Sequence, residues 1–244
     1  MTTGRLSKAG AGAGAAHEAC YLFAYPDPGT GGDPWTIGIG HTAAAGAPVV
    51  RRGDRITLAR AFEIYAADME RVEADVRAAI RPQLAQHQFD AACSFHLNTG
   101  AIRSGSIDDK LNRGDEAGAL KTWSQYINAG GKPMKGLITR RAEEIAMWRT
   151  GHYPARKILI KDTPTGSGRY IAAGAIPWRD DTGGAVVPPV VLDADRPPVK
   201  VVKSPVPPAR VRVPITVQPA APSIWSRVGG WFRSMFLNTH EWSG

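Results

Sequence analysis

The chain has 244 residues, with 27 glycines, 19 prolines and a formal net charge of +8. The prolines are sparse up to about residue 150 and crowd the stretch from Pro154 to Pro222, which excludes one compact domain over the whole length. The charge is divided in the same way. Residues 1–154 hold 18 Lys and Arg against 16 Asp and Glu, and residues 155–244 hold 12 against 6. The second part therefore favours an anionic partner such as nucleic acid, phospholipid or lipopolysaccharide, or it is only a soluble linker.

The cysteine content and the hydropathy pattern narrow the class of protein further. Cys20 and Cys93 are the only cysteines, too few for a disulfide framework, so we expect free, buried thiols in a reducing compartment. No apolar run approaches the roughly 20 residues of a spanning helix. The stretch from Met1 to Ala16 lacks the apolar centre of a secretory signal, so we expect no signal peptide.

The first elements in chain order are one helix and two strands. An Ala-rich helix is predicted from Ser7 to Glu18, and each of its glycines at positions 10, 12 and 14 weakens it by about 1 kcal/mol relative to alanine. Aromatic residues 21–25 predict a strand, the Gly/Pro-rich stretch 26–34 predicts turns, and residues 35–39 predict a second strand. Together the two strands indicate a small antiparallel sheet.

After Asp54 the apolar residues recur every three or four positions. Thr57 can N-cap a helix that continues to Ile80 and is stopped by Pro82. Shorter helices are predicted at 87–98, 105–112, 115–127 and 137–150, with Gly100, Gly114 and Gly151 as C-caps. This order predicts an α+β domain over residues 1–154, with a cleft between the sheet and the helical cluster.

The remainder of the chain contains two different patterns. Residues 155–222 are predicted to be a Pro-rich flexible linker, because repeated Pro-Pro and Pro-Val units favour extended chain. Residues 223–240 predict an amphipathic helix with Arg227 and Arg233 on its polar face. Its apolar stripe consists of Ile224, Trp225, Val228, Trp231, Phe232, Met235 and Phe236. Such a helix suits the interface of an anionic membrane, or it docks on its own domain or in a partner's groove.

Few motifs in the sequence carry chemistry. The six histidines lack metal-ligand spacing, and Gly38-Ile39-Gly40 lacks the third glycine of a dinucleotide fingerprint, so we expect neither metal nor cofactor. The basic residues of the tail are spread rather than clustered, which argues against nucleic acid as a partner. A pair of carboxylates remains: Glu18 at the end of the first helix and Asp27 in the turn after the first strand. A chain reversal can place two such groups across a cleft, as glycoside hydrolysis requires.

Three stretches together resemble a known family. The segment from Glu18 through Tyr25-Pro26-Asp27 to Thr36-Ile37-Gly38-Ile39-Gly40-His41-Thr42 is similar to the phage-type lysozymes (endolysins, muramidases) of glycoside hydrolase family 24. A second stretch resembles the central helical block of that family. It consists of Gln88-Phe89-Asp90-Ala91, Ser94-Phe95, Asn98-Thr99-Gly100, Ser106 and Lys110-Leu111-Asn112. The family's last block resembles Gly136-Leu137, Arg140-Arg141 and Glu144. The resemblance covers about residues 7–151 and implies a two-lobed lysozyme-like domain.

The resemblance implies catalytic roles by position. Glu18 matches the catalytic acid, Asp27 the second carboxylate and Thr36 the threonine of the family's triad. In this scheme Glu18 protonates the glycosidic oxygen, and Asp27 with Thr36 holds the water that attacks the anomeric carbon from the opposite face. The bond cleaved would be the β-1,4 bond between N-acetylmuramic acid and N-acetylglucosamine in peptidoglycan.

Supporting roles follow from the same resemblance. Arg141 matches an arginine expected to pair with the catalytic glutamate, and His41 matches a histidine that makes a structural ion pair in one lobe. The positions near those that line the saccharide cleft are Thr42, Leu97, Asn98 and Ser106.

Two functions stay open at this point. The first is a monomeric endolysin whose partner is peptidoglycan. It would remain in the host cytoplasm until a holin releases it to act in the periplasm, and residues 223–240 would bind anionic membrane. The second is a particle component in which the lysozyme-like domain is a wall-binding module, weakly active or inactive, anchored through its C-terminal helix. Turnover of purified peptidoglycan distinguishes them.

Overall fold

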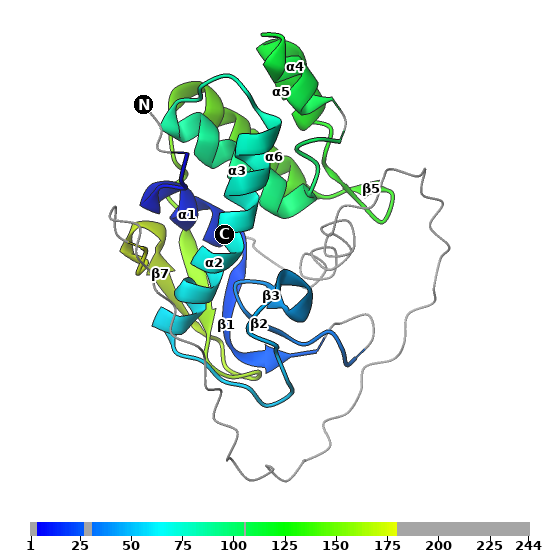
Figure 1. The fold of residues 1–244 in the computed structure, drawn as a ribbon. Coiled ribbons are helices and arrows are strands. Elements are labelled where there is room, and N and C mark those ends of the chain that lie inside the picture. The colour runs from blue at the N-terminus through cyan, green and yellow to red at the C-terminus, as the bar shows by residue number, and fades with distance from the viewer. Residues whose placement is uncertain (1–3, 27–30, 105, 180–244) are drawn as a thin grey trace.

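A computed structural model of the chain describes residues 4–26, 31–104 and 106–179 (Figure 1). Asp27, the predicted linker from residue 180 onward and the predicted helix at 223–240 lie outside the described residues. The described part is an α+β fold with a sheet at one end and a group of helices at the other, which confirms the predicted fold class.

The sheet has five strands in the order β3-β2-β1-β6-β7. In chain order the strands are β1 (Ala19–Tyr25), β2 (Thr36–Gly38), β3 (His41–Thr42), β6 (Lys157–Lys161) and β7 (Arg169–Ala172). The pairs β1–β2 and β2–β3 are antiparallel, as the sequence predicts. The pair β1–β6 is parallel, so the sheet is mixed rather than purely antiparallel.

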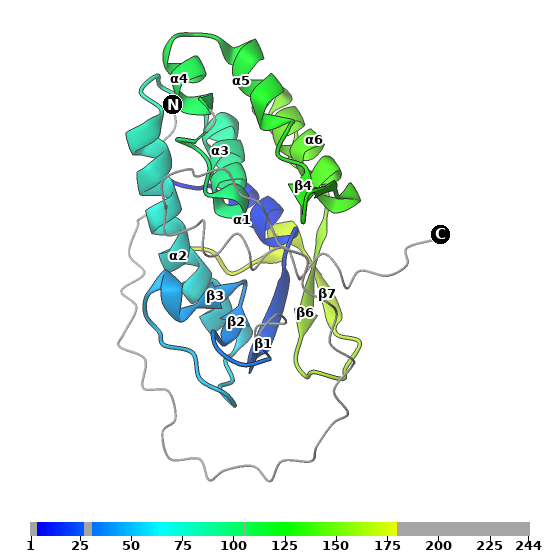
Figure 2. The same ribbon diagram turned by 90° about the vertical axis from the view of Figure 1, so that its right-hand side faces the viewer.

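The helical lobe is joined to the sheet by one long helix. Figure 2 shows α2 (Leu58–Ala79) running from the sheet to α4 in the helical lobe. The other helices are α1 (Lys8–Ala15), α3 (Gln86–Thr99), α4 (Ile107–Asn112), α5 (Glu116–Trp123) and α6 (Lys135–Thr150). Short elements complete the described part: the 3-10 helices η1 (Ala43–Ala45) and η2 (Ala173–Ala175), and a hairpin of β4 (Asn128–Ala129) and β5 (Lys132–Pro133).

The helix boundaries follow the predicted caps closely. The Thr57 side chain accepts a hydrogen bond from the Arg60 backbone N–H over 3.1 Å and begins α2. Gly100 and Gly151 end α3 and α6 in the left-handed conformation, with φ of 64° and 70°, where glycine has no steric penalty. Gly114 also has a positive φ, but the C-cap of α4 is Arg113, one residue earlier than predicted.

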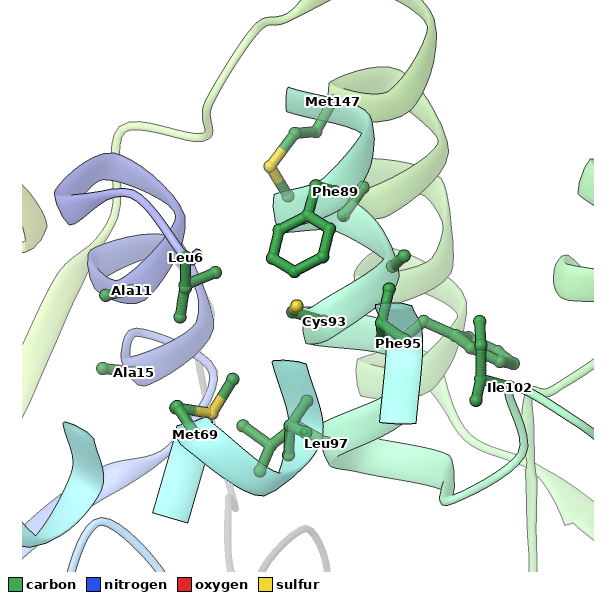
Figure 3. Close-up of a cluster of buried hydrophobic side chains, with 14 of the residues drawn as sticks. Leu6, Ala11, Ala15, Met69, Phe89, Cys93, Phe95, Leu97, Ile102 and Met147 are labelled. Carbon is green, nitrogen blue, oxygen red and sulfur yellow. The ribbon is translucent and has the colours of Figure 1, made fainter. Parts of the chain in front are cut away.

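The hydrophobic core lies where α1, α2, α3 and α6 meet (Figure 3). Phe89, Cys93 and Leu97 of α3 belong to the same buried cluster as Ala11 and Ala15 of α1 and Met69 of α2. Burying a side chain such as Phe89 contributes about 1.5–3 kcal/mol. Cys20 and Cys93 are free and buried, and burial raises the pKa of the Cys20 thiol to about 12, so it stays protonated at neutral pH.

The glycines of α1 permit close packing rather than only weakening the helix. A Cβ on Gly10 would lie 2.4 Å from Cγ of Asp90, and a Cβ on Gly12 would lie 2.3 Å from the carbonyl oxygen of Ala173. Neither approach is sterically possible, so only glycine lets α1 pack this closely on α3 and η2. The helix is also shorter than predicted, since it ends at Ala15.

The predicted boundary of the folded part at residue 154 is wrong. Residues 157–161 and 169–172 form β6 and β7, and the side chains of Ile158, Ile160 and Ile176 are part of the main core. The physical reason is that β1 has an edge not covered by β2, and pairing with β6 satisfies its backbone groups. The folded part therefore extends at least to residue 179. Within the described ranges, no helix combines the length and the apolar character needed to cross a bilayer.

Candidate active site

Glu18 lies in the three-residue connection between α1 and β1. The backbone N–H groups of Ala16, His17 and Glu18 donate to carbonyl oxygens of the last turns of α1, at 3.0, 3.2 and 3.1 Å. Glu18 itself is buried, and its Oε1 accepts a 2.7 Å hydrogen bond from Nη1 of Arg140. Its other carboxyl oxygen, Oε2, is buried and has no partner among the described residues. The carboxyl group is thus hydrogen-bonded through Oε1, while Oε2 is left without a hydrogen bond among the described residues.

The arginine that pairs with Glu18 is Arg140, and the expected pairing with Arg141 is wrong. Arg141 instead donates from Nη2 to Oδ1 of Asn98 over 2.9 Å, and its guanidinium lies over the ring of Phe95 at 5.1 Å from the centroid. Both arginines are on α6, where consecutive residues point about 100° apart. The phase of α6 turns Arg140 toward Glu18 and Arg141 toward α3.

Glu144 joins the two arginines from one turn further along α6. Its Oε1 accepts from Ser94 Oγ at 2.8 Å, Arg140 Nε at 3.0 Å and Arg141 Nη2 at 2.9 Å. Its Oε2 accepts from Trp123 Nε1 at 3.0 Å. All of these side chains are buried, so the charges are compensated within the protein and not by solvent. The network makes α6 a rigid support for the Glu18 carboxyl group.

The protein environment affects the pKa values of Glu18 and Arg140 in different ways. Burial raises the pKa of the Glu18 carboxyl above its ordinary value, and the charge and hydrogen bond of Arg140 oppose this without cancelling it. Burial alone would lower the pKa of Arg140, but the carboxylates of Glu18 and Glu144 outweigh it and raise the pKa. Arg140 stays charged because it has two carboxylate partners. Among the described residues Glu18 has one cationic partner, and its Oε2 has no partner, so its protonated form is favoured to higher pH than in an exposed glutamate.

His17, directly before Glu18, is a neutral neighbour. Burial lowers the pKa of the His17 ring to about 2, and the guanidinium groups of Arg140, Arg156 and Arg141 act in the same direction. Nε2 of His17 lies 3.4 Å from Oε2 of Glu143. The contact would be an ion pair only if the His17 ring were protonated. Because the ring is neutral at pH 7, this contact is between a neutral imidazole and a carboxylate.

Thr36 and Thr42 lie opposite each other on β2 and β3. Both are buried, and the Oγ1 atom of Thr36 has no hydrogen-bond partner among the described residues. Thr36 also pairs with Tyr25 at the far end of β1 from Glu18, and the register shifts between Tyr21 and Tyr25. Such an irregularity bends a strand. Asp27 lies outside the described residues.

His41 occupies the structural position expected for it. Nδ1 lies 2.9 Å from Oδ2 of Asp68 on α2, and Nε2 lies 2.9 Å from the carbonyl oxygen of Pro48. The ring is buried, and each of its nitrogens lies within hydrogen-bond distance of an acceptor oxygen inside the protein. The contact joins β3 to α2 and fixes the sheet against the long helix.

The other positions expected near the saccharide differ in their surroundings. Leu97 is part of the hydrophobic core, which favours a packing role over a saccharide contact. Asn98 is buried and is held by Arg141. Ser106 is half-buried before α4 and has a φ of 63°, a strained conformation for a residue other than glycine.

Sequence reasoning assigned no role to Ser94 and Trp123, which donate hydrogen bonds to Glu144, or to Tyr65 of α2. The Tyr65 hydroxyl is buried without a partner among the described residues, and burial raises its pKa. The spacing of Arg140 and Glu144 at i and i+4 is a signal for their contact. No group of three or more His, Cys, Asp or Glu suitable for a metal ion occurs among the residues that the structure describes.

Comparison with known proteins identifies the family. The model of the phage lysozyme family matches residues 15–144, more than half of the chain. The chain therefore belongs to the phage lysozyme family, a family of glycoside hydrolases that act on peptidoglycan. The match ends within α6, so β6 and β7 lie outside it.

Individual relatives agree with this assignment. The chain is 35% identical over 122 residues to an endolysin of Acyrthosiphon pisum secondary endosymbiont phage 1, covering 48% of this chain and 80% of that one. It is 34% identical over 119 residues to an endolysin of Bacillus phage PZA, covering 48% of this chain and only 45% of the PZA protein.

Solved structures give the same fold. An endolysin from Escherichia coli O157:H7 phage FAHEc1 superposes with a TM-score of 0.54 at 30% identity, over 62% of this chain and 96% of that one. A mutant of P22 lysozyme superposes with a TM-score of 0.53 at 29% identity, over 61% and 99%.

Proposed function

We propose that the protein is an endolysin that hydrolyses the β-1,4 bond between N-acetylmuramic acid and N-acetylglucosamine in peptidoglycan, with Glu18 as the general acid. The observation that carries the proposal is the state of the Glu18 carboxyl group. It is buried, it is held by Arg140 through Oε1, and its Oε2 is unpartnered among the described residues. A general acid near neutral pH needs such an environment, because it must keep its proton until the leaving oxygen takes it.

The geometry suggests which oxygen carries the proton. Oε1 accepts a hydrogen bond from a charged guanidinium, so it is the oxygen that keeps negative or carbonyl character. The proton therefore resides on Oε2, the oxygen free to donate to a substrate. Transfer to the glycosidic oxygen breaks the C–O bond and leaves Glu18 as a carboxylate paired with Arg140.

We propose that Asp27 and Thr36 complete the site. The Thr36 hydroxyl is buried and unpartnered among the described residues, as expected for a group that binds a water molecule or a substrate atom. Asp27, in its ionised form, would accept a proton from that water as it attacks the anomeric carbon. Attack from the face opposite the leaving group gives inversion. Thr42, Asn98 and Ser106 are then the residues we expect to contact the saccharide.

In this proposal the protein remains in the host cytoplasm until release and then acts in the periplasm on the cell wall. Peptidoglycan is its substrate, and residues 223–240 hold it near an anionic membrane. The protein needs no cofactor for the reaction.

The test is product analysis of purified peptidoglycan digested with the full chain. Borohydride reduction followed by mass spectrometry should find new reducing ends on N-acetylmuramic acid. Glu18→Gln should lower the rate by about 10²–10⁴-fold, the usual contribution of a general acid. Glu116→Gln, the same change at an exposed carboxylate at the start of α5, should leave the rate unchanged.

Each other outcome has a distinct meaning. Anhydro products would show a transglycosylase and refute hydrolysis. Wall binding without soluble products would favour the second function, a wall-binding module of a particle. Undiminished turnover by the Glu18→Gln variant would refute the assigned acid.

A further inference from the structure

Residues 155–179, which we name the C-terminal segment, contact both elements that flank Glu18. On the C-terminal side of Glu18, β6 pairs with β1 in parallel, with Ala19 opposite Leu159 and Tyr21 opposite Lys161. The pairing therefore begins at the residue directly after Glu18. Without β6, β1 would be the edge strand of the sheet. Pairing with β6 fixes the backbone direction of β1 from the residue after Glu18 onward.

On the N-terminal side of Glu18, η2 of the same segment packs against α1. The carbonyl oxygen of Ala173 lies only 2.3 Å from the position that a Cβ on Gly12 would take, so the two backbones are in close contact. Gly12 in turn accepts the backbone hydrogen bond of Ala16, in the connection that leads to Glu18. The C-terminal segment thus touches α1 at the turn that anchors this connection.

A side-chain contact links the beginning of the C-terminal segment to the same place. Arg156 forms two hydrogen bonds with Glu143 of α6, from Nε at 2.8 Å and from Nη2 at 2.6 Å. Oε2 of Glu143 faces Nε2 of His17 at 3.4 Å. The Arg156 carbonyl oxygen also accepts from the backbone N–H of Ala173 at 3.1 Å, which joins the start of the segment to η2.

The far end of the segment is also fixed. The Trp178 indole Nε1–H donates to the carbonyl oxygen of Leu6 over 3.3 Å, and its ring lies 5.7 Å from that of Tyr65. The segment therefore cannot move away from α1 without breaking contacts at Leu6, Gly12 and Tyr65. All of these contacts are made by residues that follow the end of the family match at residue 144.

We propose that the C-terminal segment is a positioning element of this active site, which fixes the main chain on both sides of Glu18 and so aims its carboxyl group for proton donation. The proposal rests on the function proposed for Glu18. The segment touches no reacting atom, and it acts through α1, β1 and His17. A loss of this support lets the connection between α1 and β1 move and admits water to the Glu18 carboxyl group.

The charged and titratable groups around Glu18 determine how such a loss is detected. Arg140, supported by Glu144, faces it from α6, Tyr65 lies on α2, and His17 is its chain neighbour. Arg140 stays in place when the segment alone is perturbed, because Glu144 of α6 and the carbonyl oxygen of Ser94 on α3 hold it independently. Admission of water then removes part of the burial that raises the pKa of Glu18, while Arg140 still favours the carboxylate. The pKa of Glu18 must fall.

The experiment compares the full-length wild type with Arg156→Ala and Gly12→Ala. We measure kcat and KM on purified peptidoglycan as a function of pH, and titrate the Glu18 carboxyl by carbon-13 NMR. Both variants should lower kcat by about tenfold to a hundredfold, the cost of a small misplacement of a reacting group, with KM nearly unchanged. The alkaline limb of the pH profile and the Glu18 titration should both move to lower pH.

The controls separate positioning from loss of fold. Arg60→Ala removes a 2.8 Å surface ion pair with Glu63 on α2 and should change neither readout. Near-UV circular dichroism establishes that each variant is folded at the assay temperature. If Gly12→Ala does not fold, Arg156→Ala and Glu143→Gln decide the question, because both are changes at a partly exposed ion pair.

Folded variants with wild-type kcat, pH profile and Glu18 titration would overturn the inference. Failure of the proposed function is a different result, namely a wild type that does not hydrolyse peptidoglycan. The NMR titration of Glu18 still tests the positioning role in that case, since it needs no turnover.

Discussion

Arg140 donates from Nη1 to Oε1 of Glu18 over 2.7 Å, and both side chains are buried. The same guanidinium donates from Nε to Glu144, so one arginine connects the candidate acid to a second, fully paired carboxylate. The arginine next to it, Arg141, instead donates hydrogen bonds to Glu144 and Asn98. Two adjacent arginines thus have different roles.

The first prediction separates those roles. Arg140 lowers the pKa of Glu18 against the larger effect of burial, so Arg140→Gln should raise that pKa further. The alkaline limb of the activity profile should move to higher pH, because the acid keeps its proton longer. Arg141→Gln is the matched control and should move the limb less. A pH–rate profile of the two variants, with the Glu18 titration by NMR, checks this, and equal shifts would contradict it.

The second prediction concerns the stability of the Arg140→Gln variant. Removing Arg140 leaves Glu18 without its cationic partner in the interior. Breaking a buried pair by removing one partner typically costs about 3–5 kcal/mol of unfolding free energy. Urea unfolding at pH 7 should therefore show a strong loss for Arg140→Gln. The loss should be smaller at pH 4, where Glu18 is protonated in the folded protein and needs no partner.

The third prediction concerns Glu18 itself. Its pKa is raised on folding, so its contribution to stability is present below its unfolded pKa and is lost as the pH rises through its folded pKa. Each unit of upward shift corresponds to about 1.4 kcal/mol. The neutral Glu18→Gln variant should therefore gain stability relative to the wild type between pH 4 and pH 8, and thermal midpoints across this range test that. A constant difference would argue against a raised pKa.

The fourth prediction tests the extent of the folded part. Ile160 is fully buried in β6, so Ile160→Ala should lower the free energy of unfolding by about 2–5 kcal/mol. Lys157→Ala, at an exposed position in the same strand, should change it by no more than about 0.5 kcal/mol. Chemical denaturation of the full-length variants gives both values. Equally small changes in the free energy of unfolding for both variants would show that residues 157–161 belong to the flexible linker that the composition predicts, and not to the folded part.

The fifth prediction concerns residues 223–240, which lie outside the described part of the structure. If this stretch binds a membrane interface, replacing Trp225 and Trp231 with serine should weaken binding to vesicles that contain anionic lipid. The same change at Tyr170, an exposed aromatic residue of β7, is the control. Sedimentation with vesicles at low and high salt measures the effect. Unchanged binding would remove the membrane role.

Local patterns predicted the helical lobe well. The apolar residues from Leu58 to Ile80 mark one face of α2, and the caps at Thr57, Gly100 and Gly151 lie where the structure has them. These features depend on residues close in sequence, and the sequence contains all of the information needed to recognise them.

Contacts between distant residues were harder to predict. The parallel pairing of β6 with β1 joins residues about 140 positions apart, and Lys157–Lys161 is a short run beside a Pro-rich region. A glycine is needed at position 12 because of the close approach of Ala173, which is about 160 positions further along the chain. The choice between Arg140 and Arg141 depends on the rotation of α6 about its own axis, which no spacing within the helix determines.

The buried network of Glu18, Arg140, Glu144 and Arg141 contains two acids and two bases. It is electrically neutral when Glu18 is ionised and carries one excess positive charge when Glu18 is protonated. The reactive form of the proposed acid is therefore the unbalanced one. Donation of the proton to the leaving oxygen restores the neutrality of this network, so Arg140 stabilises the carboxylate that bond cleavage leaves behind, whereas burial keeps Glu18 protonated beforehand.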